Sequence, residues 1–125
     1  MQDNAIQAVV QDYVDAFSAR NLQRCVDLYG EQATLEYGAA SYQGKKVLED
    51  WHKERFANDL QIVSINDVTV DGDTVTVEGV ITSKRLKAWR IGKLSGRATF
   101  LVRDGKIVNV HMSPRTDNIL GIFRS

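Results

Sequence analysis

The stretch DYVDAFSARNLQRCVDLYGEQATLEYG, residues 12–38, contains the changes of pattern that decide the fold. Its first part continues a run of apolar residues spaced three and four apart, which predicts an amphipathic helix over residues 3–19. Asn21 is a good N-cap for a second, short helix, and Gly30 is expected to end that helix. Apolar and polar residues then alternate in ATLEY, residues 33–37. The stretch therefore predicts two helices followed by a strand.

The residues that follow on the C-terminal side add one helix and a long series of strands. SYQG, residues 41–44, suits a short returning strand, and the apolar spacing predicts a third helix over residues 45–57. After Asn58, the segments LQIVSINDVTV, TVTVEGVITSKRL, GRATFLV and KIVNVHM alternate as strands do. Asp-Gly pairs at residues 71–72 and 104–105 separate such segments, and Asp-Gly is a strong signal for a short hairpin turn.

This order predicts an α+β domain in which helices cover one face of an antiparallel sheet. Strands of this length are expected to curl, and Gly79, Gly92 and Gly96 lie within strand patterns, where glycine often marks a bulge or a bend. A curved sheet wrapped around helices would enclose a conical pocket.

The composition limits the classes of protein that the chain can belong to. Its 125 residues suit a single domain over residues 1–125, and its 16 acidic and 16 basic residues argue against a whole-protein nucleic-acid binder. A single cysteine, Cys25, excludes an internal disulfide and suits a reducing compartment. No signal-like segment and no run of about 20 apolar residues occurs, so we expect a cytoplasmic protein that spans no membrane. The scattered histidines and cysteine form no metal motif, and we expect no cofactor.

Residues 84–97 form a basic segment, because no acidic residue occurs between Glu78 and Asp104. The basic residues of this region are Lys84, Arg85, Lys87, Arg90, Lys93, Arg97 and Arg103. The favoured interpretation is a solvated hairpin whose charges protect its edge from aggregation. A rim that binds an anionic ligand is the next alternative, and a nucleic-acid patch is the last.

The order of elements resembles the nuclear transport factor 2-like (cystatin-like) fold, in the branch of the SnoaL-like and ketosteroid isomerase-like proteins. The residues that carry the resemblance are the opening stretch, YQGKKVLEDWHKERF and FLVRDGKIVNVHM, and with the strands between them they cover nearly the whole chain. The resemblance implies a pocket for a small molecule and an outer sheet face that often pairs two subunits, so we expect a homodimer. It implies little about the reaction, because one fold hosts many functions.

Ketosteroid isomerases use an aspartate base together with an oxyanion hole made of a tyrosine and a protonated aspartic acid. By resemblance, Tyr13 matches that tyrosine, whereas Tyr37 stands at the position of the base and Ala98 at that of the acid. A phenol with an ordinary pKa of about 10 is scarcely ionised at pH 7. The resemblance therefore implies the frame of an isomerase without its two carboxyl groups, and we expect negligible ketosteroid isomerase activity.

His52 is the first candidate for acid–base chemistry. It shares a helical row with Leu48 and Phe56, on a helix that borders the pocket in the related enzymes, and histidine can act as a general base near neutral pH. The alternative is a hydrogen-bonded histidine at the edge of the core. Tyr13 likewise either lines the pocket or only packs its helix against the core.

The strand KIVNVHM alternates, and the family comparison places Val108, Val110 and Met112 toward the pocket and Ile107, Asn109 and His111 on the outer face. The predicted catalytic residues are His52, Tyr13 and Tyr37. The predicted ligand-binding residues are Trp51, Phe56, Ala98, Phe100, Val110 and Met112.

Two classes of function follow. The first is a protein that binds a small hydrophobic or weakly acidic molecule, and that acts as an isomerase, cyclase or hydratase if it is an enzyme. The second is a noncatalytic binding or dimerisation domain with the same fold.

Overall fold

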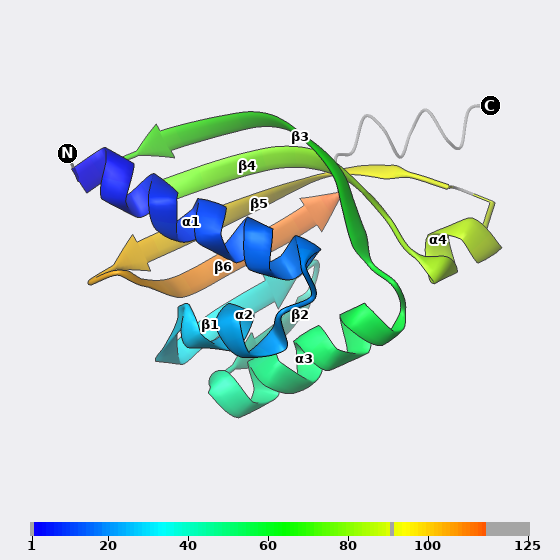
Figure 1. Cartoon of the computed structure of the whole chain (residues 1–125), viewed down its shortest axis with the longest axis horizontal. Coiled ribbons are helices and arrows are strands. Elements are labelled where there is room, and N and C mark those ends of the chain that lie inside the picture. The colour runs from blue at the N-terminus through cyan, green and yellow to red at the C-terminus, as the bar shows by residue number, and fades with distance from the viewer. Residues whose placement is uncertain (1, 91, 115–125) are drawn as a thin grey trace.

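The computed structural model describes residues 2–90 and 92–114, and Figure 1 shows the order of their elements. The helices are α1 (Gln2–Ser18), α2 (Leu22–Asp27), α3 (Lys45–Ala57) and α4 (Lys84–Ala88). The strands are β1 (Tyr29–Tyr37), β2 (Ala40–Gln43), β3 (Gln61–Asp71), β4 (Thr74–Thr82), β5 (Leu94–Arg103) and β6 (Lys106–Pro114). None of the helices in this part of the chain is long and apolar enough to cross a membrane.

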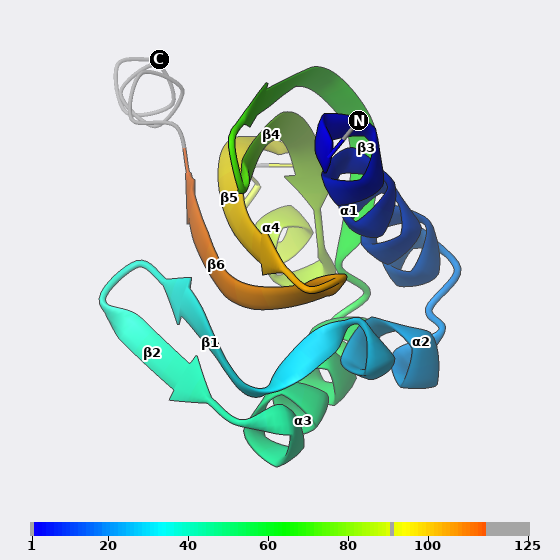
Figure 2. The ribbon, with the colours of Figure 1, turned by 90° about the vertical axis from the view of Figure 1, so that its left-hand side faces the viewer.

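The strands form one curved, open sheet in the order β2-β1-β6-β5-β4-β3. Neighbouring strands run antiparallel except β1 and β6, which are parallel. Figure 2 shows the sheet curling around the interior, with α1 lying along its open side and with α2 and α3 beside β1. The core fills the space between α1 and the concave face of the sheet. The predicted α+β class and curved sheet are therefore confirmed.

The short helix α2 begins where the sequence predicts and ends earlier. The Asn21 side chain accepts a hydrogen bond from the backbone N–H of Arg24, which is the predicted N-cap. The expectation that Gly30 ends this helix is wrong, because β1 already begins at Tyr29. Tyr29 is fully buried and pairs with Ile107 of β6, so strand pairing and burial determine the conformation of this segment.

Both Asp-Gly pairs lie at hairpin turns, as predicted, although Asp71 still belongs to β3 and the β3–β4 loop consists of Gly72 and Asp73. The loop between Arg103 and Lys106 consists of Asp104 and Gly105 alone, and both have positive φ angles of 53° and 75°. Two central residues with positive φ are the mark of a type I′ turn, whose twist matches that of the flanking strands. At the β3–β4 turn, Gly72 has a φ of 59°. These turns set the register of the hairpins β3–β4 and β5–β6.

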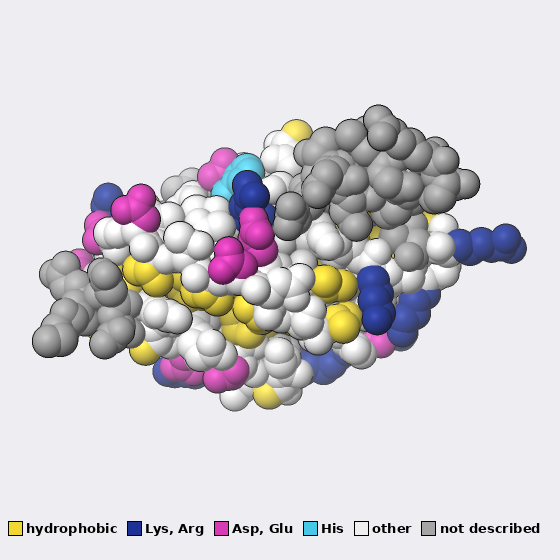
Figure 3. All heavy atoms as spheres, turned by 90° about the horizontal axis from the view of Figure 1, so that it is seen from above, with side chains coloured by type: hydrophobic (Ala, Val, Ile, Leu, Met, Phe, Trp, Pro, Cys, Tyr) yellow, Lys and Arg dark blue, Asp and Glu magenta, His cyan; other side chains and the backbone are white. Residues whose placement is uncertain are grey.

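The basic segment does not form the predicted hairpin. β4 ends at Thr82, and the hydroxyl of Ser83 accepts a hydrogen bond from the backbone N–H of Leu86, which caps α4. The connection to β5 therefore contains a helical turn in which Leu86 is buried and the basic side chains around it are exposed. Lys and Arg side chains gather at the α4 end of the molecule in Figure 3. Whether they bind an anion stays a prediction.

The outer face of β6 differs from the prediction because the strand contains a bulge. Leu101 pairs with Asn109 and the next residue, Val102, pairs with Ile107, so Val108 is an extra residue on the β6 side. The bulge resets the alternation, and Ile107 is fully buried in the core, contrary to its predicted place on the outer face. Asn109 donates a hydrogen bond to Glu36. A homodimer formed through this face stays a prediction.

Gly79 is placed where the backbone of β3 leaves no room for a side chain. A Cβ atom on Gly79 would lie 2.5 Å from the backbone oxygen of Ser64, whereas a Cβ atom on its cross-strand partner Gly96 would meet the oxygen of Ser113 at 3.5 Å. We expect Gly79→Ala to lower the free energy of unfolding by about 1–3 kcal/mol, because β3 would have to shift. Gly96→Ala is the matched control. Equal denaturation midpoints for the two variants would contradict this explanation.

Candidate functional site

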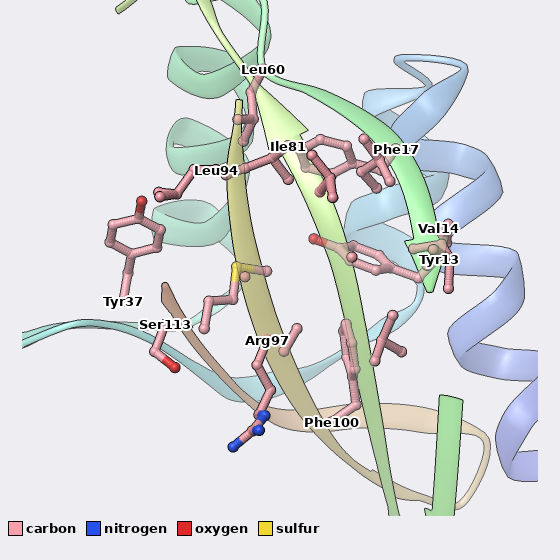
Figure 4. Close-up of a pocket in the computed structure, with 18 of the residues that line it drawn as sticks. Tyr13, Val14, Phe17, Tyr37, Leu60, Ile81, Leu94, Arg97, Phe100 and Ser113 are labelled. Atoms are coloured by element: carbon pink, nitrogen blue, oxygen red, sulfur yellow. The ribbon is translucent and has the colours of Figure 1, made fainter. Parts of the chain in front are cut away.

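A cavity of about 130 Å³ lies between the concave face of the sheet and the helices α1 and α3. Strands β3, β4 and β5 form most of its wall, through residues such as Ile62, Val77 and Leu94. Helix α1 adds Tyr13, Val14 and Phe17, α3 adds Trp51, and the ends of β1 and β6 add Tyr37, Met112 and Ser113. Figure 4 shows side chains of this wall arranged around the cavity, among them Tyr13, Phe17, Tyr37, Leu94 and Phe100. The surface of the wall is almost entirely apolar.

Few polar groups reach this wall. Among the described residues that line it, none is acidic, and Arg97 is the one with a charged side chain. Its guanidinium group donates hydrogen bonds of 2.9 and 2.7 Å to Glu78, and in Figure 4 it points away from the ring of lining side chains. The remaining polar side-chain groups are the hydroxyls of Tyr13, Tyr37 and Ser113 and the indole of Trp51. Among residues 2–90 and 92–114, the cavity wall therefore offers hydrogen-bonding groups and no carboxylate.

The Tyr13 hydroxyl is held by His52. Its oxygen lies 2.7 Å from His52 Nε2, and His52 Nδ1 lies 2.7 Å from the backbone oxygen of Leu48, one turn earlier in α3. His52 has an exposed fraction of 0% and does not line the cavity. Its ring makes edge contacts with five aromatic rings at centroid distances of 4.9–6.2 Å, those of Tyr13, Phe17, Tyr29, Trp51 and Phe56.

Burial determines the charge state of this pair. It lowers the pKa of His52, the nearby Arg55 lowers it further, and the hydrogen bond to the Leu48 carbonyl acts in the opposite direction. Burial also raises the pKa of Tyr13, and its neighbour Tyr29 adds to this effect. Both shifts favour the uncharged form, so a neutral imidazole contacts a neutral phenol at pH 7.

The structure separates the predicted site residues into two groups. Six of them line the cavity, namely Tyr13, Tyr37, Trp51, Ala98, Phe100 and Met112. The other three, His52, Phe56 and Val110, lie behind that wall. The ring of Phe56 packs against that of Phe17 at 5.1 Å, and Val110 is fully buried between its sheet partners Leu35 and Phe100. His52 thus lies behind the wall residues Tyr13, Phe17 and Trp51, and its hydrogen bond to this wall goes to Tyr13.

Arg55 is a residue near the site that the sequence analysis did not single out. Its guanidinium carbon lies 4.7 Å from the centre of the Trp51 ring and 5.6 Å from that of Tyr37, so one cation is shared by two aromatic residues of the wall. Tyr37 is 38% exposed, which places it where the cavity meets solvent. The spacing of four residues between Trp51 and Arg55 on one helix was the signal that could have found this contact.

Several wall residues from the middle strands were also missed. On β4, Val77 and Ile81 share one face by simple alternation. On β3, Ile62 and Ile65 are three residues apart and both line the cavity because a bulge between Ile62 and Ser64 resets the alternation. The curvature of the whole sheet determines which face of each strand is concave. The sequence of a single strand does not contain that information. Among the described residues, no group of three or more histidine, cysteine or acidic side chains is placed to hold a metal ion.

Comparison with known proteins identifies relatives of the fold. A model of the SnoaL-like domain matches residues 10–110, whereas no curated protein matches the sequence. A proposed ketosteroid isomerase from Kribbella flavida superposes with a TM-score of 0.79 at 18% identity, over 92% of this chain and 81% of that one. A proposed polyketide cyclase from Xanthomonas campestris gives 0.79 at 20% identity, over 97% and 98%. An LEH-like epoxide hydrolase from M. tuberculosis gives 0.78 at 14%, over 99% and 93%. At these identities the likeness concerns the fold alone.

Proposed function

The chain belongs to the SnoaL-like domain family, and we propose that it binds a small, uncharged, largely apolar molecule in the cavity between α1 and the curved sheet. The proposal treats residues 1–125 as one domain. The observation that carries it is the wall itself, which is apolar apart from a few hydroxyl and indole groups. Of the wall residues that the structure describes, Arg97 alone is charged, and it is paired with Glu78. Such a wall favours apolar ligands and orients them through few polar contacts.

The structural relatives support the same class of ligand. Their names refer to isomerisation, to cyclisation of a polyketide and to hydrolysis of an epoxide, and all three describe reactions of small organic molecules. In this chain Tyr37 and Ala98 line the cavity, at the two positions where the family resemblance would place carboxyl groups. Binding of a related molecule is therefore better supported than the ketosteroid isomerase reaction.

Proton transfer at Tyr13 and His52 is the second candidate function. The 2.7 Å contact between the two side chains favours it, because Tyr13 could take a proton from a ligand while passing its own proton to His52 Nε2. In this transfer Tyr13 gains one proton and loses one, so it stays neutral. The ligand becomes an anion and His52 becomes an imidazolium. Burial disfavours that cation, as the lowered pKa of His52 indicates. Catalysis therefore ranks below binding.

Ligand binding can be followed by the fluorescence of Trp51, which lines the cavity. The sequence has two tryptophans, so Trp89→Phe leaves Trp51 as the reporter. We expect 1-indanol, an apolar bicyclic alcohol, to change this fluorescence in a saturable way. Ala98→Phe, which fills the cavity, should weaken the binding by about 10-fold or more.

Thr99→Phe is the control, because Thr99 neighbours Ala98 on β5 and points to the opposite face of the sheet. Unchanged binding in Ala98→Phe, or an equal loss in Thr99→Phe, would contradict the proposed location of the site.

A further inference from the structure

We infer that the cavity selects a ligand whose buried polar group donates a hydrogen bond, such as a hydroxyl, over the matching ketone. The inference rests on the proposed function and specifies its ligand. It is carried by a chain of groups that runs from the backbone oxygen of Leu48 through the ring of His52 to the hydroxyl of Tyr13 at the cavity wall.

The first step fixes the position of the hydrogen on the His52 ring. Nδ1 lies 2.7 Å from the Leu48 carbonyl oxygen, and a carbonyl oxygen can only accept a hydrogen bond. Nδ1 therefore carries a hydrogen and donates it to Leu48. In a neutral imidazole the other nitrogen, Nε2, then has a lone pair and no hydrogen.

The second step concerns the charge of His52. The ring is completely buried among aromatic side chains of α1, β1 and α3. The Arg55 cation on its own helix also disfavours a positive charge on the ring. None of the contacts that the structure describes for this ring is made with a carboxylate, so the surroundings oppose a positive charge. Nε2 of the neutral ring must accept, and the Tyr13 O–H must donate to it.

The third step follows the Tyr13 oxygen into the cavity. A phenol has one hydrogen, and His52 uses it, so only the lone pairs of the oxygen are left. The buried hydroxyl of the neighbouring Tyr29, which has no hydrogen-bond partner among the described residues, can occupy one of them, and the other is left for a ligand. In Figure 4 this oxygen points from α1 toward the interior of the ring of lining side chains. A ligand hydroxyl there would gain a hydrogen bond, whereas a ketone oxygen would lose water and meet a second acceptor. This polarity is opposite to that of a tyrosine that stabilises an oxyanion by donating to it.

The test compares each enantiomer of 1-indanol with 1-indanone, which share one carbon skeleton and differ in the single polar group. In the Trp89→Phe protein we expect the better-bound alcohol to bind about 5–10-fold more tightly than the ketone, the effect of one buried hydrogen bond. Tyr13→Phe should abolish the preference. In His52→Phe the hydrogen of Tyr13 is released to the cavity, and the preference should shift toward the ketone.

A measurement on the unaltered protein keeps the inference testable if the His52 variant does not fold. ¹⁵N NMR of labelled histidine at pH 7.5 should show Nε2 of His52 unprotonated and Nδ1 protonated. A protonated Nε2 would overturn the inference. Equal affinities for the alcohols and the ketone, or tighter binding of the ketone, would also overturn it while leaving the proposed function intact. If none of the probes bound, the proposed function would fail, and the inference would fail with it.

Discussion

Replacing His52 by alanine is expected to lower the free energy of unfolding by about 3–5 kcal/mol. The side chain is completely buried and its ring contacts five aromatic neighbours, so its removal leaves a cavity inside a packed cluster. It also removes the partner of the Tyr13 hydroxyl, a buried donor that then lacks a hydrogen bond. Both losses act on the folded state, and they add in the same direction.

Chemical denaturation at pH 7.5 measures this effect, and His111→Ala is the control because that histidine is exposed on β6. We expect the control to change stability by no more than about 0.5 kcal/mol. The comparison separates the two interpretations of His52 that the sequence leaves open. A histidine that served only as a base in an open pocket would be removed at little cost, so equal stabilities of the two variants would contradict its role as a buried structural group.

Local signals account for most of the fold, because each acts within a few residues. The helical spacing over residues 45–57 predicts α3 at its exact bounds, and the pair Asp104-Gly105 predicts its hairpin through the positive φ angles that the turn requires. The predictions that were wrong concern residues whose conformation depends on strand partners far away in the sequence. Gly30 lies in a strand because β1 pairs with β6, and Ile107 faces the core because a bulge opposite Leu101 and Val102 resets the alternation of β6.

In the candidate site, too, local patterns in the sequence predict some features, and contacts between distant residues determine the others. Helical periodicity correctly placed Leu48, His52 and Phe56 on one inward-facing row of α3. Periodicity alone does not show whether this row faces the cavity or the core. In the structure, Tyr13 and Phe17 of α1 contact His52 and line the cavity, so they separate His52 from it. The contact of Tyr13 with His52 joins residues 39 positions apart. No short-range pattern contains that information, whereas the tyrosine and the histidine were each recognisable as candidates.

The second large effect expected from this pair is a loss of stability in mild acid. His52 is neutral in the folded protein, and burial holds its pKa below the usual value of 6.5, which the unfolded chain is expected to have. As the pH falls below about 6.5, the unfolded state binds a proton at this position and the folded state does not, so the free energy of unfolding decreases. The stabilisation is fully present above pH 6.5 and is lost as the pH falls toward the pKa of the folded state.

The slope of this loss approaches about 1.4 kcal/mol per pH unit, which gives up to about 2 kcal/mol between pH 8 and pH 5. His52→Gln removes the titrating group, and His111→Gln in both proteins removes the other histidine of the sequence. The carboxylates are common to the two proteins, so their contributions cancel in the difference between the two stability curves. Denaturation at pH 5.0, 6.5 and 8.0 should show the protein with His52 losing stability faster toward acid than the His52→Gln variant. Parallel curves would mean that His52 has the same pKa in the folded and the unfolded state, which would contradict the lowered pKa of the buried ring.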